Sequence, residues 1–289
     1  MILGGDRIPV IENIKKFSAS GEFHNKVELH DPVLTPAEAR QITDNFIENR
    51  KKLSFKAKSV VARAAAQIAT KLLNRSTEIV GMEKIPADIG GMIITSNHFS
   101  PIENTVIRHL TNKLGRKNVS IISQTTNFAM PGVIGFLMNY ADTIPISVEP
   151  RYLARDFLSV LKEKLVENHE AVLLYPEQEM WFNYRKPRPP KGGAYFYSAK
   201  LGIPIVSCFV EMTDLNEDEN DNKDFKQVKY TLHVLDVLYP DKNKTSKENT
   251  EYMAETDYNL KRECYEKVYG KKLDYTFEPW DIAGWKGEL

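Results

Sequence analysis

The chain has 289 residues, enough for one large hydrophobic core, or for one core with an appended helical segment. Its 39 Lys and Arg residues balance its 39 Asp and Glu residues, so no overall positive charge favours nucleic acid as a partner. The sequence has no run of roughly 18 uninterrupted apolar residues, which a membrane-spanning helix needs, and it does not begin like a signal peptide. The two cysteines, Cys208 and Cys264, have neither disulfide-framework nor metal-ligand spacing. We therefore expect an intracellular protein whose contact with a membrane is peripheral.

Residues 1–75 are predicted to form an N-terminal segment, partly irregular and partly helical. Glycines and prolines break up residues 1–35, which are predicted to be irregular, while Thr35-Pro36-Ala37-Glu38 is typical of a helix start. Residues 50–75 contain eight basic residues and no acid, with apolar residues at helical spacing, which predicts a basic amphipathic helix. Two interpretations stay open. The helix lies on an anionic membrane surface, or its apolar face packs on the rest of the protein.

From residue 76 onward, short apolar runs alternate with helical patterns. This alternation predicts an α/β domain over residues 76–289, built on a mixed, mostly parallel sheet flanked by helices and followed by a C-terminal helix and tail. The expected strands are residues 77–81, 92–95, 118–123, 143–147, 171–175, 203–212 and 226–239.

A histidine follows the expected strand at 92–95. His98 precedes an expected helix start, in which Ser100 is the N-cap and Glu103 is the third helical residue. In open α/β sheets, ligands collect at the carboxyl ends of the strands. Glu103 has two potential roles: it orients the His98 ring as in a general-base pair, or it only completes the capping box with Ser100. No nucleophile accompanies the pair, so the attacking hydroxyl is expected to belong to the substrate.

Two further motifs follow later in the chain. Tyr175-Pro176-Glu177 ends a buried strand, which by itself is equally typical of a solvated loop. The stretch from Arg185 to Gly193 places four cations between prolines before a helix start, which is typical of either a phosphate site or an exposed basic loop. The histidines share no ligand spacing, so no metal is predicted.

The order of these motifs resembles the glycerolipid acyltransferase family, whose best-known members are the 1-acylglycerol-3-phosphate acyltransferases. The resemblance covers about residues 76–212 and rests on Asn97-His98 with Glu103, Tyr175-Pro176-Glu177, the stretch Lys191-Gly192-Gly193-Ala194 and the strand entry Gly202-Ile203-Pro204-Ile205. It implies that a histidine base removes the proton from a glycerol hydroxyl, which then attacks an acyl thioester.

The resemblance assigns roles to residues of this chain. His98 would be the base and Glu103 the counterpart of the family's aspartate. The implied acyl donor is acyl-CoA or acyl carrier protein, with no other cofactor, and the implied acceptor is a lysophospholipid such as 1-acylglycerol 3-phosphate. The expected location is the cytoplasmic face of the cell membrane. The implied substrate-binding residues are Asn97, Ser100, Tyr175, Pro176, Glu177, Arg185, Arg188, Lys191 and Gly192.

The sequence departs from the family pattern at three points. Glu103 is one methylene longer than the family's aspartate, Gln178 replaces a glycine, and the arginine that follows the family's middle strand has no clear equivalent, since only Arg151 follows residues 144–147. Two alternatives to acyl transfer are a thioester hydrolase, in which His98 activates water, and a non-catalytic lipid-binding protein, in which Glu103 is only a cap.

Overall fold

The computed structural model describes residues 7–116 and 118–287. Seven strands of these residues form one sheet in the order β1-β7-β6-β2-β5-β3-β4. β6 and β7 pair antiparallel, and the other neighbouring pairs are parallel, as the sequence predicted for a mixed, mostly parallel sheet. The strands are β1 (Glu78–Val80), β2 (Met92–Thr95), β3 (Val119–Gln124), β4 (Thr143–Ile146), β5 (Ala171–Leu174), β6 (Ile205–Asp218) and β7 (Lys226–Leu238).

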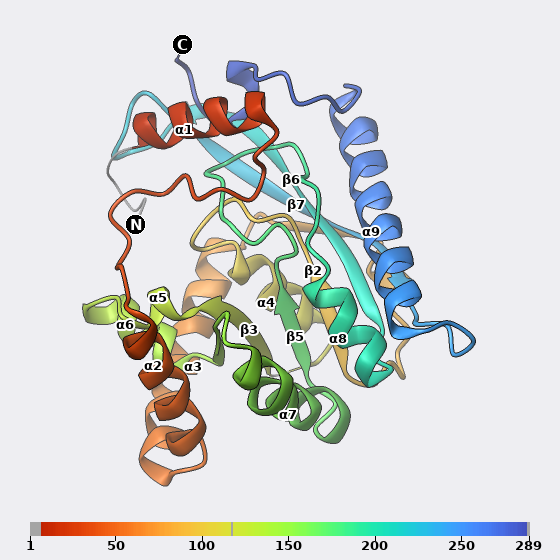
Figure 1. Ribbon diagram of the computed structural model, residues 1–289. Helices are drawn as coiled ribbons and strands as arrows, with labels where there is room; N and C mark the ends of the chain where they lie inside the picture. Colours follow the sequence, from red (N-terminus) through yellow and green to blue (C-terminus); the bar gives the residue numbers. More distant parts are fainter. Residues whose placement is uncertain (1–6, 117, 288–289) are drawn as a thin grey trace.

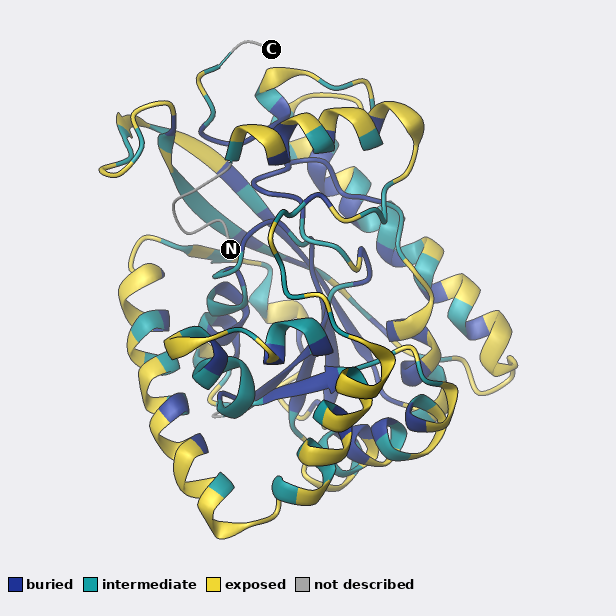
Figure 2. Ribbon diagram, turned by 60° about the vertical axis from the view of Figure 1, so that its left-hand side comes forward, coloured by how far each residue is buried: buried dark blue, intermediate teal, exposed yellow. Residues whose placement is uncertain are grey.

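Helices cover both faces of the sheet (Figure 1). The side chains of β2 alternate between two hydrophobic clusters: Ile94 packs with α4, and Ile93 packs with α7, α8 and α9. All four residues of β2 are buried, as expected for a central strand with helices on both sides (Figure 2). The α-helices are α1 (Arg7–Ser20), α2 (Pro36–Asn49), α3 (Leu53–Leu73), α4 (Asn104–Lys113), α5 (Thr125–Phe128), α6 (Gly132–Tyr140), α7 (Leu158–Lys162), α8 (Gly193–Leu201) and α9 (Ser246–Tyr269).

The prediction that residues 1–35 are irregular is wrong for residues 7–20, which form α1. Pro9 lies in the first turn of α1, where proline is tolerated because that turn's N–H groups have no partner within the helix. Ile11 and Ile14 are fully buried in a cluster with Trp181 and Phe225. α1 therefore shares a core with residues far along the chain, and the division at residue 76 stays a prediction.

α2 and α3 confirm the two helices that the sequence predicted before residue 76. Thr35 caps α2 with a complete capping box. α3 does not pack its apolar face on the protein: Val61 and Ile68 are each 61% exposed and Leu72 is 52% exposed. The interpretation in which this face packs on the sheet is therefore wrong. None of the helices in the described ranges is long and apolar enough to cross a bilayer.

Candidate active site

His98 and Tyr175 meet because their strands are neighbours. β2 and β5 pair in parallel, so the residues that follow them emerge at the same edge of the sheet. His98 follows β2, and Tyr175 follows β5 directly. The two rings stack with their centroids 4.1 Å apart and their planes 6° apart. The carboxyl edge of the central strands thus brings together the two motifs that lie 77 positions apart in the sequence.

The Glu103 carboxylate contacts His98 through one oxygen. Glu103 Oε1 is hydrogen-bonded to His98 Nδ1, and its side chain is only 3% exposed. The His98 side chain is 21% exposed, and within the described part of the chain its Nε2 atom makes no hydrogen bond. A carboxylate that accepts from Nδ1–H holds the tautomer in which Nε2 carries the lone pair. The arrangement is that of a general base with an orienting acid.

The second oxygen of Glu103 makes, at the same time, the backbone contact expected from a capping box, in the turn before α4. Glu103 Oε2 accepts hydrogen bonds from the backbone N–H groups of Phe99 and Ser100, the latter at 2.6 Å. The two roles that the sequence left open therefore do not compete. The helix starts later than predicted, since α4 begins at Asn104 and Glu103 itself is the N-cap. The predicted helix start at Ser100 is wrong because residues 101–103 form the turn that returns the carboxylate to His98.

The Tyr175 hydroxyl lies close to this pair. It is buried and has no hydrogen-bond partner in the described ranges. Burial and the nearby Glu103 carboxylate raise the pKa of Tyr175 well above its ordinary value, so the phenol stays neutral. The Tyr175 ring covers one face of the His98 imidazole and its polar atom is turned away from solvent. Its expected contact with substrate stays a prediction.

Glu177 also has internal partners. Its carboxylate is buried and accepts from the backbone N–H of His98 at 3.2 Å and from the backbone N–H of Arg188 at 3.0 Å. Arg188 adds an ion pair, with Nη2 at 2.9 Å from Glu177 Oε2. Both carboxylate oxygens of Glu177 thus have partners within the protein, and its expected contact with the acceptor stays a prediction.

Asn97, Ser100 and Pro176 are buried as well, and their expected contact with substrate stays a prediction. The Asn97 amide pairs with both backbone groups of Val210 on β6, accepting at 2.8 Å and donating at 3.1 Å. This pairing joins the segment that follows β2 to the neighbouring strand β6. Pro176 accepts a hydrogen bond from the Lys191 backbone at 2.8 Å, which holds the two predicted loops together.

The two arginines of the 185–191 loop are buried and have partners within the protein. Arg185 is 2% exposed and donates to the Met212 and Trp280 carbonyls and to Asp214. Arg188 is 2% exposed and donates to the Phe23 carbonyl at 2.7 Å. In the described structure both guanidinium groups are enclosed by the protein's own acceptors, and phosphate binding by Arg185 and Arg188 stays a prediction.

Lys191 and Gly192 remain exposed at the start of α8. His24, on the segment between α1 and α2, lies near Lys191. It was not predicted from the sequence as a residue of the site. His24 Nδ1 is 3.3 Å from the Glu177 carbonyl oxygen. Partial burial lowers the pKa of His24, and the positive charges of Lys191 and Arg188 lower it further. No spacing in the sequence links residue 24 to residue 191, because only the tertiary path of the N-terminal segment brings them together.

We compared the chain with known proteins. The sequence profile described as "Acyltransferase" matches residues 76–211, which include His98, Glu103, Glu177 and Lys191. These residues belong to the acyltransferase family. Among solved structures, the 1-acyl-sn-glycerophosphate acyltransferase PlsC from Thermotoga maritima is 17% identical, with a TM-score of 0.49 over 82% of this chain and 96% of that chain. No curated protein matches the chain.

At residue 178, where the sequence departs from the family motif, the backbone keeps a conformation that glycine favours. Gln178 takes the place of the family's glycine and has φ of +68°. Few residues other than glycine adopt this left-handed region, and the strain costs about 1 kcal/mol. The turn after Glu177 thus does not need to change shape to accept Gln178, and its side chain points outward as an exposed group.

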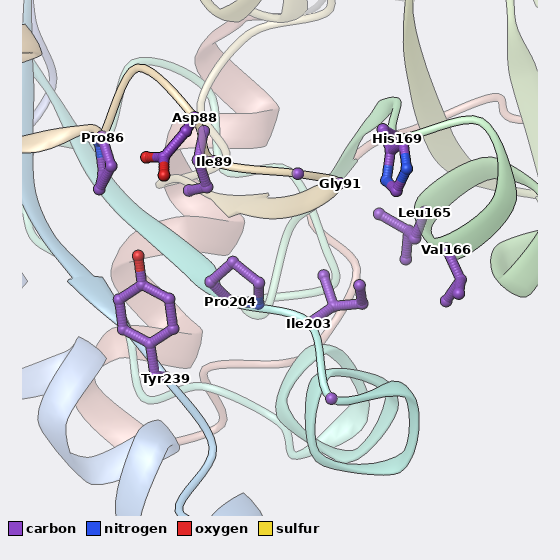
Figure 3. A pocket seen from close by; sticks show the side chains of 12 residues that line it. Pro86, Asp88, Ile89, Gly91, Leu165, Val166, His169, Ile203, Pro204 and Tyr239 are labelled. Carbon is purple, nitrogen blue, oxygen red and sulfur yellow. The ribbon is translucent and has the colours of Figure 1, made fainter.

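A cavity of about 410 Å³ lies at the opposite edge of the sheet in the acyltransferase domain (Figure 3). Gly91, His169 and Pro204 line it, and they precede β2, β5 and β6 respectively. The cavity is therefore at the amino ends of the strands whose carboxyl ends carry His98 and Tyr175. It is separated from the candidate base by the length of the sheet.

Proposed function

We propose that the chain transfers a fatty acyl group from acyl-CoA or acyl carrier protein to a glycerol-type hydroxyl, with a lysophospholipid such as 1-acylglycerol 3-phosphate as the acceptor. The observation that carries the proposal is the His98–Glu103 pair, held in a domain of the acyltransferase family. His98 Nε2 takes the proton of the acceptor hydroxyl, and the resulting oxygen nucleophile attacks the thioester carbonyl carbon. The imidazolium then protonates the departing thiolate. No other cofactor is needed.

Glu103 stabilises the imidazolium that forms in this step, because its Oε1 faces Nδ1. The developing oxyanion of the thioester needs other donors than the amides of Phe99 and Ser100, since both already donate to Glu103. Lys191 is our candidate for the acceptor's phosphate. It is the exposed cation of the 185–191 loop, and its backbone is tied to the residue next to Glu177.

We further propose that α3 holds the enzyme on the cytoplasmic face of the cell membrane. Its exposed apolar residues accompany Lys56, Lys58 and Lys71, so the helix offers an apolar surface and positive charge together. Such a helix binds anionic lipid in the plane of the interface. This location would place the candidate base where a lysolipid acceptor is found.

Acceptor dependence tests the proposed reaction. The purified protein is given a labelled acyl-CoA or acyl carrier protein and a panel of lysolipids with and without a phosphate head group. We expect thiol release that depends on the acceptor and is matched by label in the diacyl product. Equal thiol release without any acceptor would indicate a thioester hydrolase, and no release with any donor would indicate a non-catalytic lipid-binding protein. Either result contradicts the proposal.

A further inference from the structure

Both backbone groups of His98 are held by residues of another loop. Its N–H donates to Glu177 Oε2 at 3.2 Å. Its carbonyl oxygen accepts from the Trp181 backbone at 3.0 Å and from Arg188 Nη2 at 3.4 Å. The peptide units on either side of His98 are thus fixed from the loop that follows β5, while the ring is fixed by Glu103 and Tyr175.

Glu177 and Arg188 form one buried unit. Glu177 is 4% exposed and Arg188 is 2% exposed. The guanidinium group of Arg188 lies 4.6 Å from the centre of the Trp181 ring and also donates to the carbonyl oxygens of Phe23 and Glu179. Burial lowers the pKa of Arg188, and the Glu177 carboxylate opposes this shift. Each charge is therefore compensated by the other.

We propose that Glu177 and Arg188 are positioning residues: the pair holds the backbone of His98 so that its ring meets Glu103 and the substrate in a fixed orientation. The inference rests on the proposed function only in taking His98 as the base. It gives Glu177 and Arg188 a role different from the phosphate contact that their sequence motifs imply. It also explains why a cation is buried next to the base without touching the reacting atoms.

The N-terminal segment takes part in this arrangement. Arg188 Nη1 donates to the Phe23 carbonyl, and the Trp181 indole N–H donates to the Asn25 carbonyl at 3.0 Å. Hydrogen bonds therefore join residues 23–25 to Arg188 and to Trp181. Both charges of the pair are buried, and exclusion of water strengthens the electrostatic attraction between them.

The split between kcat and KM tests the proposal. We compare Glu177→Gln, Arg188→Gln and the double variant with wild type, using the full-length chain. A positioning role predicts that each single change lowers kcat about 100-fold while KM for the acceptor changes by less than about threefold. Lys191→Met provides the contrast, since loss of a phosphate contact raises KM. A rise of KM in Glu177→Gln or Arg188→Gln with kcat retained would overturn the proposal.

Hydrogen exchange supplies a readout that does not need activity. In the single variants, the His98 amide hydrogen should exchange at least about tenfold faster than in wild type. Arg155→Gln is the matched control, because Arg155 pairs with Asp156 at an exposed site and its loss should leave the His98 amide unchanged. If a single variant does not fold, the double variant, which leaves no unpaired buried charge, carries the same measurement. Unchanged exchange at His98 would overturn the inference. A chain without transferase activity but with faster exchange would overturn only the proposed function.

Discussion

The imidazole ring of His98 lies flat on the phenol ring of Tyr175, with the ring centroids 4.1 Å apart and the planes 6° apart. The stack sets the plane of the imidazole, and the hydrogen bond from Nδ1 to Glu103 sets its rotation within that plane. Together the two contacts leave the Nε2 edge as the part of the ring that meets a substrate. The strands β2 and β5, together with the turn between Phe99 and Glu103, thus determine the position of the His98 ring.

Two substitutions of Tyr175 test the contribution of the ring stack separately from that of the hydroxyl. Tyr175→Phe keeps the ring and removes only the buried hydroxyl, so we expect activity within about threefold of wild type. Tyr175→Leu loses the ring and should lower kcat at least about tenfold. Steady-state kinetics and denaturant unfolding of both variants check this. Equal activity of the Leu and Phe variants would show that the stack does not position His98.

Glu103→Gln separates capping from catalysis. The glutamine carbonyl oxygen can still accept from the Phe99 and Ser100 amides, so the loss of stability should be limited to about 1–2 kcal/mol. Its NH₂ group would then face His98 Nδ1 and favour the tautomer that carries its proton on Nε2. We expect kcat to fall by roughly 10²–10⁴. Turnover close to wild type would mean that Glu103 serves only to hold the turn before α4.

Glu28 predicts a pH dependence of stability. Burial, followed by the negative charges of Asp31 and Glu179, raises the pKa of Glu28 from 4.5 to about 7. Between these values the folded protein keeps a proton that the unfolded chain has lost. Stability from this group is therefore complete below about pH 4.5 and decreases as the pH rises to about 7.

Glu28→Gln should therefore stabilise the protein by about 1–3 kcal/mol at pH 8, where wild-type Glu28 is charged, and by much less at pH 5. Denaturant unfolding at the two pH values measures the difference. Glu12→Gln is the control, because Glu12 is an exposed residue of α1 and should show no such contrast. The same gain at both pH values would contradict the assignment.

The exposed face of α3 predicts binding to anionic membranes. Replacing Val61, Ile68 and Leu72 together by Gln should weaken binding to phosphatidylglycerol vesicles at least about tenfold, because these side chains lose the apolar surface that would enter the interface. Unfolding free energy should stay nearly constant, since the three side chains are exposed. Val148→Gln is the control, because Val148 is 96% exposed and lies outside α3. Unchanged vesicle sedimentation of the triple variant would contradict the membrane role.

The sequence alone predicted an element correctly where the local residue pattern agreed with the packing of the core. The strand Met92–Thr95 followed by His98, and the threonine cap of α2, were predicted from residues that act on their immediate neighbours. α1 was missed because its stability comes from packing on Trp181 and Phe225, more than 150 positions away, which no local pattern shows.

In the candidate site, too, contacts between near neighbours in the sequence could be predicted and contacts between distant segments could not. His98 and Glu103 are five positions apart, and their contact follows from one turn. The partners of Arg185 and Arg188 come from distant segments, including the Phe23 and Trp280 carbonyls, so their burial could not be predicted from a cluster of cations in the sequence. Charge in a sequence shows which groups are present, and only the fold shows which of them are already paired.

The central claim is that His98 is the base of an acyl transfer. The most direct test follows transfer from a labelled acyl-CoA or acyl carrier protein to the best lysolipid acceptor, with wild type and His98→Ala side by side and equal unfolding free energies as the check of folding. We predict that His98→Ala lowers the rate of acceptor acylation by at least about 10³, because no other group replaces the base. Equal incorporation of label by the two proteins would contradict the account.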